Sequence, residues 1–355
     1  MRKGFSALLL ALGLVSVTAC STDLEVYAPA KEIRSVYCIL NPNDTVQYVR
    51  VAKAFQVEGD AISYAAQNDL SVSGLQVKLT GDGKIWTATQ VDDFPRNDGG
   101  FPATHTVYKF TTDGSGPGRD TLAHDQEYSL DVGAPDADDY VTGTTQLPAR
   151  PRIRGVFSLV AGAGTTQCLP RLSLDRKFNF FWRKAGGNAS YEVRVGLEYQ
   201  ANGEEKFIQY GPDDLITENN RCNEGAGSIC VQFAEKELLR RFVQGMPEDP
   251  FITYTYDTGD SCVLSNNDLH LLPTSLWFEV TAVDEYLGNY MIVNDPKVSD
   301  VSGTKPEYTN LRGNIDVVGI FGSYNADRKY AILNVCSEAL LGLNGSLQVG
   351  SCSWD

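Results

Sequence analysis

The sequence is poor in the residues and motifs from which metal and catalytic sites are usually built. It has only three histidines, His105, His124 and His270, which are scattered along the chain, and no Cys-x-x-Cys pair. It also lacks the Gly-x-Ser-x-Gly, His-Glu-x-x-His and phosphate-loop motifs. These absences argue against a zinc site. They also predict a protein that has no cofactor and is not an enzyme.

Basic residues are scarce relative to acidic ones. There are 30 lysines and arginines against 45 aspartates and glutamates, so the formal net charge is −15 at pH 7. A chain with this charge repels polyanions, which predicts that neither nucleic acid nor an anionic lipid surface is a partner. With so many carboxylates, a pair that could serve glycoside hydrolysis arises by chance, so acidic pairs identify no active site.

The start of the chain has the pattern of a lipoprotein leader. The apolar run Ala7–Val17 follows two basic residues and is too short to span a bilayer. It leads into Val17-Thr-Ala-Cys20, a small-residue cleavage site that ends in cysteine. We interpret residues 1–19 as a signal peptide, Cys20 as the lipidated first residue of the mature chain, and residues 20–32 as its anchor and tether. A plain secretory signal followed by a coincidental cysteine is the alternative.

The remaining cysteines also fit an exported protein. Besides Cys20 there are seven, and an odd number in an oxidising compartment predicts three disulfides and one free thiol. Cys38 is the predicted free thiol, because Ile33–Leu40 has the pattern of a buried strand, where cysteine acts as a small apolar residue. The predicted pairs are Cys222 with Cys230, Cys336 with Cys352, and Cys168 with Cys262. The sequence alone leaves this connectivity open.

Short stretches of alternating apolar and polar residues dominate the mature chain. Residues 191–199 put two tyrosines, two valines and a leucine on one side, and residues 75–79 and 128–132 show the same alternation. This period of two is typical of a half-buried β-strand. Gly-rich turns separate the stretches. We therefore predict a mainly β fold of tandem antiparallel β-sandwich modules, of the immunoglobulin or fibronectin type III kind, with a short helical insertion.

The two prolines of Leu147–Pro151 favour an extended connection and predict a domain boundary. Residues 33–150 then form an N-terminal β-sandwich and residues 151–304 a second module. Residues 305–355 are expected as a C-terminal segment.

The second module contains two aromatic or apolar strand patterns, Phe178–Trp182 and Leu276–Asp284. Their order resembles that of a fibronectin type III module. A helix is expected near residues 233–243, where the apolar residues recur at helical spacing and would share one face.

Three further stretches together resemble a known family. They are Val36–Phe55, Tyr128–Val132 running on to Thr145–Pro148, and Tyr308–Gly322. With the leader, they are similar to the Bacteroidota lipoproteins grouped as domain of unknown function 4249. Cys38 and the Asp316–Val318 stretch, where more glycine is expected, are departures from that pattern.

The resemblance implies an outer-membrane lipoprotein that is often encoded beside a TonB-dependent receptor. The expected partner is therefore such a receptor or another surface protein complex, with membrane attachment through the lipid. The family has no assigned chemistry, so no catalytic residue carries over. A free-standing glycan- or protein-binding adhesin is the alternative function, and a hydrolase with an unrecognised site is a third.

Two small clusters are candidates for ligand binding. Asp136, Asp138 and Asp139 alternate as calcium ligands do, but no EF-hand loop is completed, and a solvated hairpin turn explains them equally well. Tyr254 and Tyr256 would lie on one face of a strand, where they could stack on a sugar or a peptide, or belong to the core.

Overall fold

The structure is a computed structural model that describes fourteen segments of the chain. They are residues 33–54, 60–96, 102–112, 122–133, 139–157, 171–172, 177–186, 188–201, 204–211, 227–245, 256–263, 269–273, 276–294 and 308–333. The predicted signal peptide, Cys20 and the tether lie outside them. Within these segments no helix combines the length and the apolar character that a membrane crossing needs.

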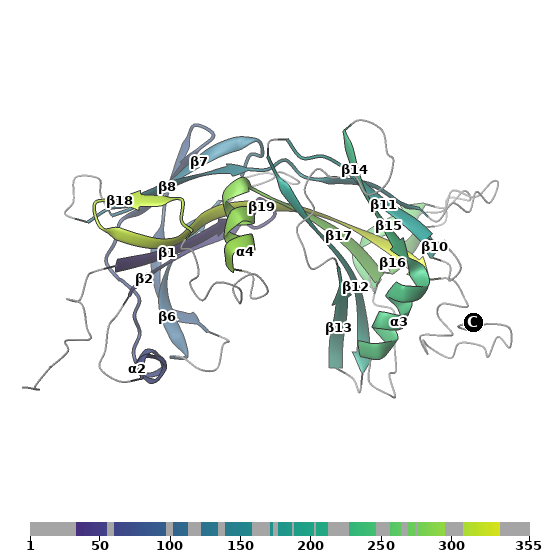
Figure 1. Ribbon diagram of the computed structural model, residues 1–355, viewed down its shortest axis with the longest axis horizontal. Helices are drawn as coiled ribbons and strands as arrows, with labels where there is room; N and C mark the ends of the chain where they lie inside the picture. Colours follow the sequence, from purple (N-terminus) through teal and green to yellow (C-terminus); the bar gives the residue numbers. More distant parts are fainter. Residues whose placement is uncertain are drawn as a thin grey trace, which may run out of the picture.

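The prediction of a mainly β fold is confirmed, because the described residues form four sheets (Figure 1). The largest has the order β13 (Glu204–Tyr210), β12 (Ser190–Ala201), β17 (Leu276–Val283), β19 (Asp316–Leu333), β1 (Ile33–Leu40), β2 (Val46–Lys53), β6 (Thr104–Thr111) and β5 (Thr89–Pro95), with β10 (Arg171–Leu172) also beside β19. A five-stranded sheet has the order β18 (Leu311–Gly313), β8 (Val141–Leu147), β7 (Gln126–Val132), β3 (Val77–Gly81) and β4 (Lys84–Thr87).

The two smaller sheets and the helices complete the described structure. The three-stranded sheet has the order β14 (Ser228–Ala234), β11 (Lys177–Arg183) and β9 (Arg152–Phe157), and β15 (Tyr256–Val263) pairs with β16 (Leu269–Pro273). The helices are α2 (Ala61–Gln67), α3 (Glu235–Gly245) and α4 (Glu285–Asn294).

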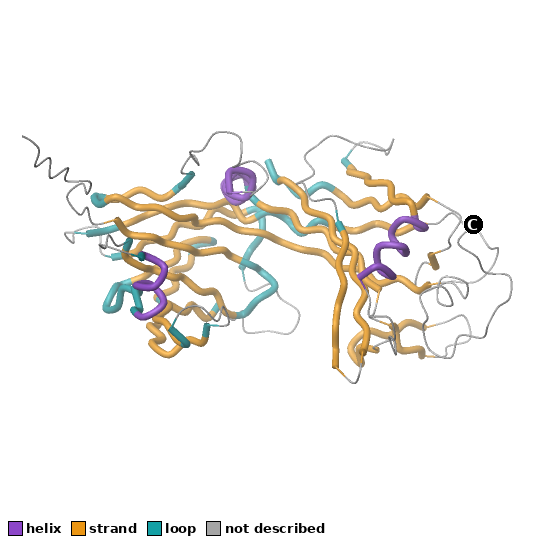
Figure 2. Tube along the Cα trace, turned by 60° about the horizontal axis from the view of Figure 1, so that its bottom comes forward, coloured by secondary structure: helices purple, strands orange, loops and turns teal. Residues whose placement is uncertain are grey.

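One strand, β19, runs through both halves of the molecule. Its residues 316–323 pair in parallel with β1, and its residues 324–331 pair in antiparallel with β17. The largest sheet is therefore continuous from one half to the other. Figures 1 and 2 show this connection in two views of the molecule, and β19 is the long strand labelled in Figure 1.

The first sandwich encloses its core between β19-β1-β2-β6-β5 and the five-stranded sheet. The alternating residues of 75–79 and 128–132 point into this core as predicted, with Val77, Leu79, Tyr128, Leu130 and Val132 all buried. Leu311 and Phe321 lie in the same core. The first sandwich is thus completed by residues from the part of the chain expected as a C-terminal segment.

The second sandwich encloses its core between β13-β12-β17-β19 and β14-β11-β9. In chain order its seven strands are β9, β11, β12, β13, β14, β17 and β19. The first, second and fifth form one sheet, and the other four form the facing sheet. This three-plus-four sandwich is the arrangement of a fibronectin type III module, as the sequence predicts. Its β12 buries the alternating residues Tyr191, Val193, Val195, Leu197 and Tyr199.

The predicted helical insertion is confirmed as α3. Leu238 and Phe242 are buried in the second core, whereas Arg240 and Arg241 are exposed. The helix begins two residues later than the predicted range, because Phe233 and Ala234 still belong to β14 and pair with β11.

Helix α4 follows β17 directly and was not predicted. Its apolar side chains are spread around the helix instead of forming one stripe, so the helical period gives no signal in the sequence. Leu287 is buried against β19, where its Cβ occupies the space that a side chain at Gly322 would need.

A row of buried polar side chains on β19 holds the connection between the sandwiches. Ser323, Asn325 and Asp327 lie at alternate positions and are at most 6 % exposed. We call them the polar ladder. Their contacts run along residues 146–153, with Ser323 Oγ 3.2 Å from the Gln146 carbonyl oxygen, Asn325 Nδ2 donating to the Pro148 carbonyl oxygen at 3.2 Å, and the Ile153 N–H donating to Asp327 Oδ2 at 2.8 Å. Arg150 adds an ion pair with Asp327 at 2.8 Å. These contacts fix the path of the connection across β19.

The double pairing of β19 predicts that the two sandwiches unfold together. Phe321 is fully buried, so Phe321→Ala should lower the free energy of unfolding by about 3–5 kcal/mol. Because β19 belongs to both sandwiches, scanning calorimetry should show one transition that moves as a whole. Ile85→Ala is the control, since Ile85 is 69 % exposed and its loss should cost under about 0.5 kcal/mol. Two transitions of which only one shifts would contradict this coupling.

Candidate functional site

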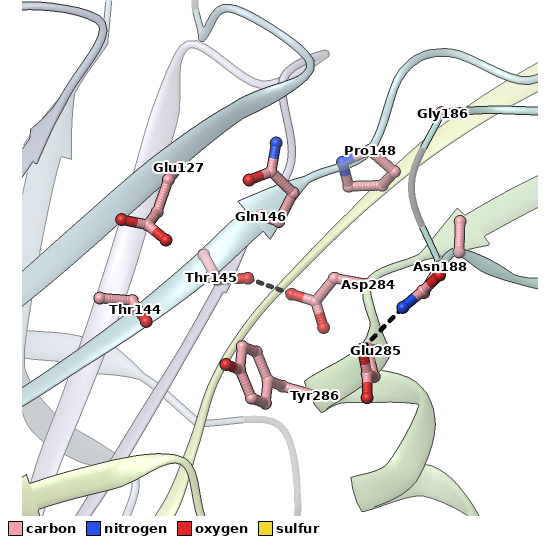
Figure 3. Close-up of a pocket in the computed structure, with 11 residues that line it drawn as sticks. Glu127, Thr144, Thr145, Gln146, Pro148, Gly186, Asn188, Asp284, Glu285 and Tyr286 are labelled. Atoms are coloured by element: carbon pink, nitrogen blue, oxygen red, sulfur yellow. Dashed lines mark hydrogen bonds between the residues drawn. The ribbon is translucent and has the colours of Figure 1, made fainter.

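A cavity of about 380 Å³ lies between the two sandwiches, beside the N-terminus of α4 (Figure 3). Both halves contribute to its walls. Glu127, Thr145 and Gln146 come from the first sandwich, Asn188 comes from the second, and Asp284 and Tyr286 come from the start of α4. We call it the junction cavity.

The buried carboxylate of the junction cavity is Asp284, which is 3 % exposed. Its Oδ1 accepts the Leu287 N–H at 2.5 Å, which makes it the N-cap of α4. Its Oδ2 accepts a hydrogen bond from the Thr145 hydroxyl, marked in Figure 3, and lies 2.9 Å from Ser323 Oγ. One carboxyl group thus joins α4, β8 and the polar ladder.

Burial raises the pKa of the Asp284 carboxyl above its ordinary value, although the hydrogen bonds from Leu287, Thr145 and Ser323 act in the opposite direction. A raised pKa is often a sign of a catalytic acid. Here both carboxyl oxygens are already engaged by groups that hold the fold together. We therefore assign Asp284 to positioning α4 at the junction.

Exposed apolar side chains occur on β1, β2 and the neighbouring helix α4. Eight large apolar side chains of the described residues are exposed; Tyr37, Ile39 and Tyr48 are on the two strands, and Tyr286 and Ile292 are on the helix. Tyr37 of β1 contacts Tyr290 of α4 with ring centroids 6.5 Å apart, which links the strand group to the helix group. We call these five residues the apolar surface. Clustered exposed apolar residues are typical of binding surfaces.

A second, shallower cavity of about 360 Å³ lies within the apolar surface at the tip of the β1–β2 hairpin. Three tyrosines from neighbouring strands line it, namely Tyr37, Tyr48 and Tyr324. Asn41 and Asp44 provide polar groups at its rim. We call it the tyrosine depression.

The hairpin tip beside this depression is held by Gln47, whose side chain is almost fully buried. Gln47 Nε2 donates to the carbonyl oxygens of Asn41 and Asp44 at 2.8 and 2.9 Å, and Gln47 Oε1 accepts the Asn41 N–H at 2.9 Å. Asn41 Nδ2 donates to Asp44 Oδ2 at 2.7 Å. The polar rim is therefore preformed.

The cysteines predicted to form disulfides lie largely outside the described residues. Cys168, Cys222, Cys336 and Cys352 are not described, and Cys262 lies on β15 with a side chain that is not described. Cys230 is fully buried on β14 and is not a free thiol, but its partner is not described, so the three pairings stay predictions.

Cys38 is a buried free thiol on β1, as predicted. Burial raises the pKa of this thiol. A protonated, buried thiol is unreactive, so Cys38 has a packing role in the first core.

The acidic cluster considered as a calcium site lies mostly outside the described residues, so it stays untested. Asp136 and Asp138 are not described, and Asp139 forms an ion pair with Arg34, which is 2 % exposed. In the described segments no group of three or more His, Cys, Asp or Glu side chains is arranged to hold a metal ion. Tyr254 is not described, and the side chain of Tyr256 is not described either.

Sequence reasoning missed the apolar surface for a physical reason. Val36–Leu40 is almost entirely apolar, which fits a strand buried on both faces. In the structure Val36, Cys38 and Leu40 are buried, whereas Tyr37 and Ile39 are 39 % and 43 % exposed. The signal that could have found the surface is the tyrosine in each hairpin strand, at an outward position.

The capping role of Asp284 predicts different results for two substitutions. Asp284→Ala removes the N-cap and takes away the acceptor of the Leu287 N–H and of the Thr145 hydroxyl, so the free energy of unfolding should fall by about 2–3 kcal/mol. Asp284→Asn keeps an acceptor for the helix and should cost less than about 1 kcal/mol at pH 7. Chemical denaturation of both variants measures the difference, and equal losses would contradict the assignment.

The wild type and the Asp284→Asn variant together test the raised pKa of Asp284. The folded state holds the Asp284 proton more tightly than the unfolded chain does. The stabilisation that this tighter proton binding gives the folded state is therefore fully present below the usual aspartate pKa, about 3.9. It is lost as the pH rises through the pKa that Asp284 has in the folded protein. The unfolding free energy of the wild type, minus that of Asp284→Asn, should fall as the pH rises above about 4. A difference that rises with pH would contradict it.

Comparison with known proteins places the chain in a family. A search of curated proteins finds no match. Among solved structures, the chain is similar to the FN1–FN3 domains of chicken CNTN1, with 9 % sequence identity, 85 % of this chain and 68 % of that chain covered, and a TM-score of 0.14. The fold assignment therefore rests on the strand order described above. Residues 21–330 match the family described as domain of unknown function, DUF4249. The chain belongs to the DUF4249 family.

Proposed function

We propose that the protein is a non-enzymatic, lipid-anchored binding protein of the outer membrane that acts beside a TonB-dependent receptor. The observation that carries the proposal is the apolar surface. Five of the eight exposed large apolar side chains in the described part of the chain belong to it, three on β1 and β2 and two on α4, which touches β1 where Tyr290 meets Tyr37. Exposing apolar side chains to water is unfavourable in free energy, and binding a partner removes that apolar surface from water.

The placement of the surface on the first sandwich supports a partner at the membrane. Ile33 begins β1 and follows Cys20 by 13 residues, which span at most about 45 Å when fully extended. A lipid on Cys20 would therefore keep Tyr37 and Tyr48 within reach of the exposed parts of a membrane protein. Confinement to the membrane raises the effective concentration of such a partner without additional contacts.

The charge of the chain supports the same class of partner. A formal net charge of −15 disfavours nucleic acid and anionic lipid surfaces. Aromatic and apolar contacts do not depend on this charge. The apolar surface is therefore suited to a protein partner whose contact region is apolar or aromatic.

The lipid anchor is tested by one substitution. Cys20→Ser removes the thiol that would carry the lipid, so the protein should leave the membrane fraction or remain uncleaved. Metabolic labelling with a fatty acid, followed by fractionation, measures both effects. Ser21→Ala is a control that leaves the thiol in place. Labelling that persists in Cys20→Ser would show that the lipid is not on this residue.

The receptor is tested by photo-crosslinking in intact cells. A photoreactive amino acid at Ile292, which is 47 % exposed on α4, should crosslink to an outer-membrane receptor identified by mass spectrometry. The matched control is the same amino acid at Ile85, which is 69 % exposed on β4 and lies outside the apolar surface. Crosslinks at position 292 only to other copies of this chain would refute the accessory role and favour the adhesin.

A further inference from the structure

The tyrosine depression has the properties of a preformed ligand site. Tyr37 and Tyr48 are each about two-fifths exposed, yet both rings have aromatic neighbours. Tyr37 meets Tyr290 edge-on at 6.5 Å, and Tyr48 lies 4.8 Å from Phe94. The rings are thus held in place by strands and by neighbouring rings, so little conformational freedom is lost when a ligand binds.

The charges around the depression do not favour an ionic ligand of either sign. Asp44 lies at the rim, and the cross-strand partners of Tyr37 and Tyr48 are the cationic residues Arg50 and Lys109. An anion would approach the carboxylate, and an organic cation would approach the two basic side chains. A neutral ligand meets neither repulsion.

The polar rim does not favour a purely apolar ligand. Covering Asn41 and Asp44 with hydrocarbon would remove water from an amide and a carboxylate, which is unfavourable unless hydrogen bonds replace the water. A neutral sugar meets both requirements. Its C–H face can lie on an aromatic ring, and its hydroxyl groups can bond to an amide and a carboxylate.

We propose that the tyrosine depression binds a neutral oligosaccharide, with Tyr37 and Tyr48 as the stacking rings and Asn41 and Asp44 as the hydrogen-bonding rim. The volume of about 360 Å³ is at the lower end of the usual range for small-molecule sites, about 300–1,000 Å³, so one or two sugar rings are seated. The inference rests on the proposed function, because it names the class of substrate that the binding protein holds near its receptor.

The test uses the mature, lipidated protein in a detergent without a sugar headgroup. Cellotriose, mannotriose and xylotriose are titrated at up to millimolar concentrations by isothermal titration calorimetry. At least one of them should bind. Tyr48→Ala and Tyr37→Ala should each weaken that binding by at least about tenfold, and Tyr48→Phe, which keeps the ring, should stay within about threefold.

The matched control is Tyr64→Ala. Tyr64 is 40 % exposed on α2, as Tyr48 is on β2, so the two substitutions remove the same group at the same exposure. The affinity of Tyr64→Ala should equal that of the wild type. Denaturation curves of the alanine variants check that each is folded.

Three results would overturn the inference. They are no binding of any of the three sugars, binding that survives in both tyrosine-to-alanine variants, and tighter binding of tri-arginine or trigalacturonate than of any neutral sugar. The Ile292 crosslink, repeated in the Tyr48→Ala chain, separates this inference from the proposed function. If the wild type binds none of the sugars but still crosslinks to a receptor, the sugar site alone is refuted. If the wild type binds a sugar but does not crosslink to a receptor, the accessory role alone is refuted.

Discussion

The pairing of β19 with β1 along one half and with β17 along the other is the constraint on which the rest of the structure depends. It makes a single sheet the common wall of two sandwiches, so neither core can be closed without the same strand. Sheets that share a strand cannot reorient without breaking its backbone hydrogen bonds. The apolar surface, which is formed by β1, β2 and α4, therefore has one geometry and not a range of geometries set by a hinge.

The change of side-chain type along β19 explains how one strand serves two cores. Phe321 faces the first core, and the next inward positions, Ser323, Asn325 and Asp327, are polar where the strand passes under the connection between the sandwiches. An apolar row there would bury the backbone groups of residues 146–153 without partners. The polar row satisfies them instead, and hydrogen bonds specify a register that apolar contact alone does not. Asp284 extends the same network to α4, so the helix is placed by the junction itself.

The sequence predicts the local structure well and the long-range structure less well. Alternation identifies β3, β7 and β12, because one face of each strand is buried and the other is not. It cannot identify the partner of a strand, so the parallel pairing of β1 with residues 316–323 has no local signal. Helix α4 has no polar face and thus no detectable period. Tyr37 and Tyr48 look like core residues because large apolar side chains usually are, and only the pairing of β1 and β2 shows which face they occupy.

The position of the aromatic residues fits a binding role that combines weak contacts with confinement. Tyr37 and Tyr48 lie on strands and not on loops, so their rings are already ordered and binding costs little entropy. Such contacts are individually modest. The proposed attachment through Cys20 would compensate, because the 13 residues from Cys20 to Ile33 would keep the surface near any partner in the same membrane. The rigid wall and the ordered rings would act together with the proposed tether. Each would lower the free energy that binding must supply, so that neither a deep pocket nor a strongly charged site would be required.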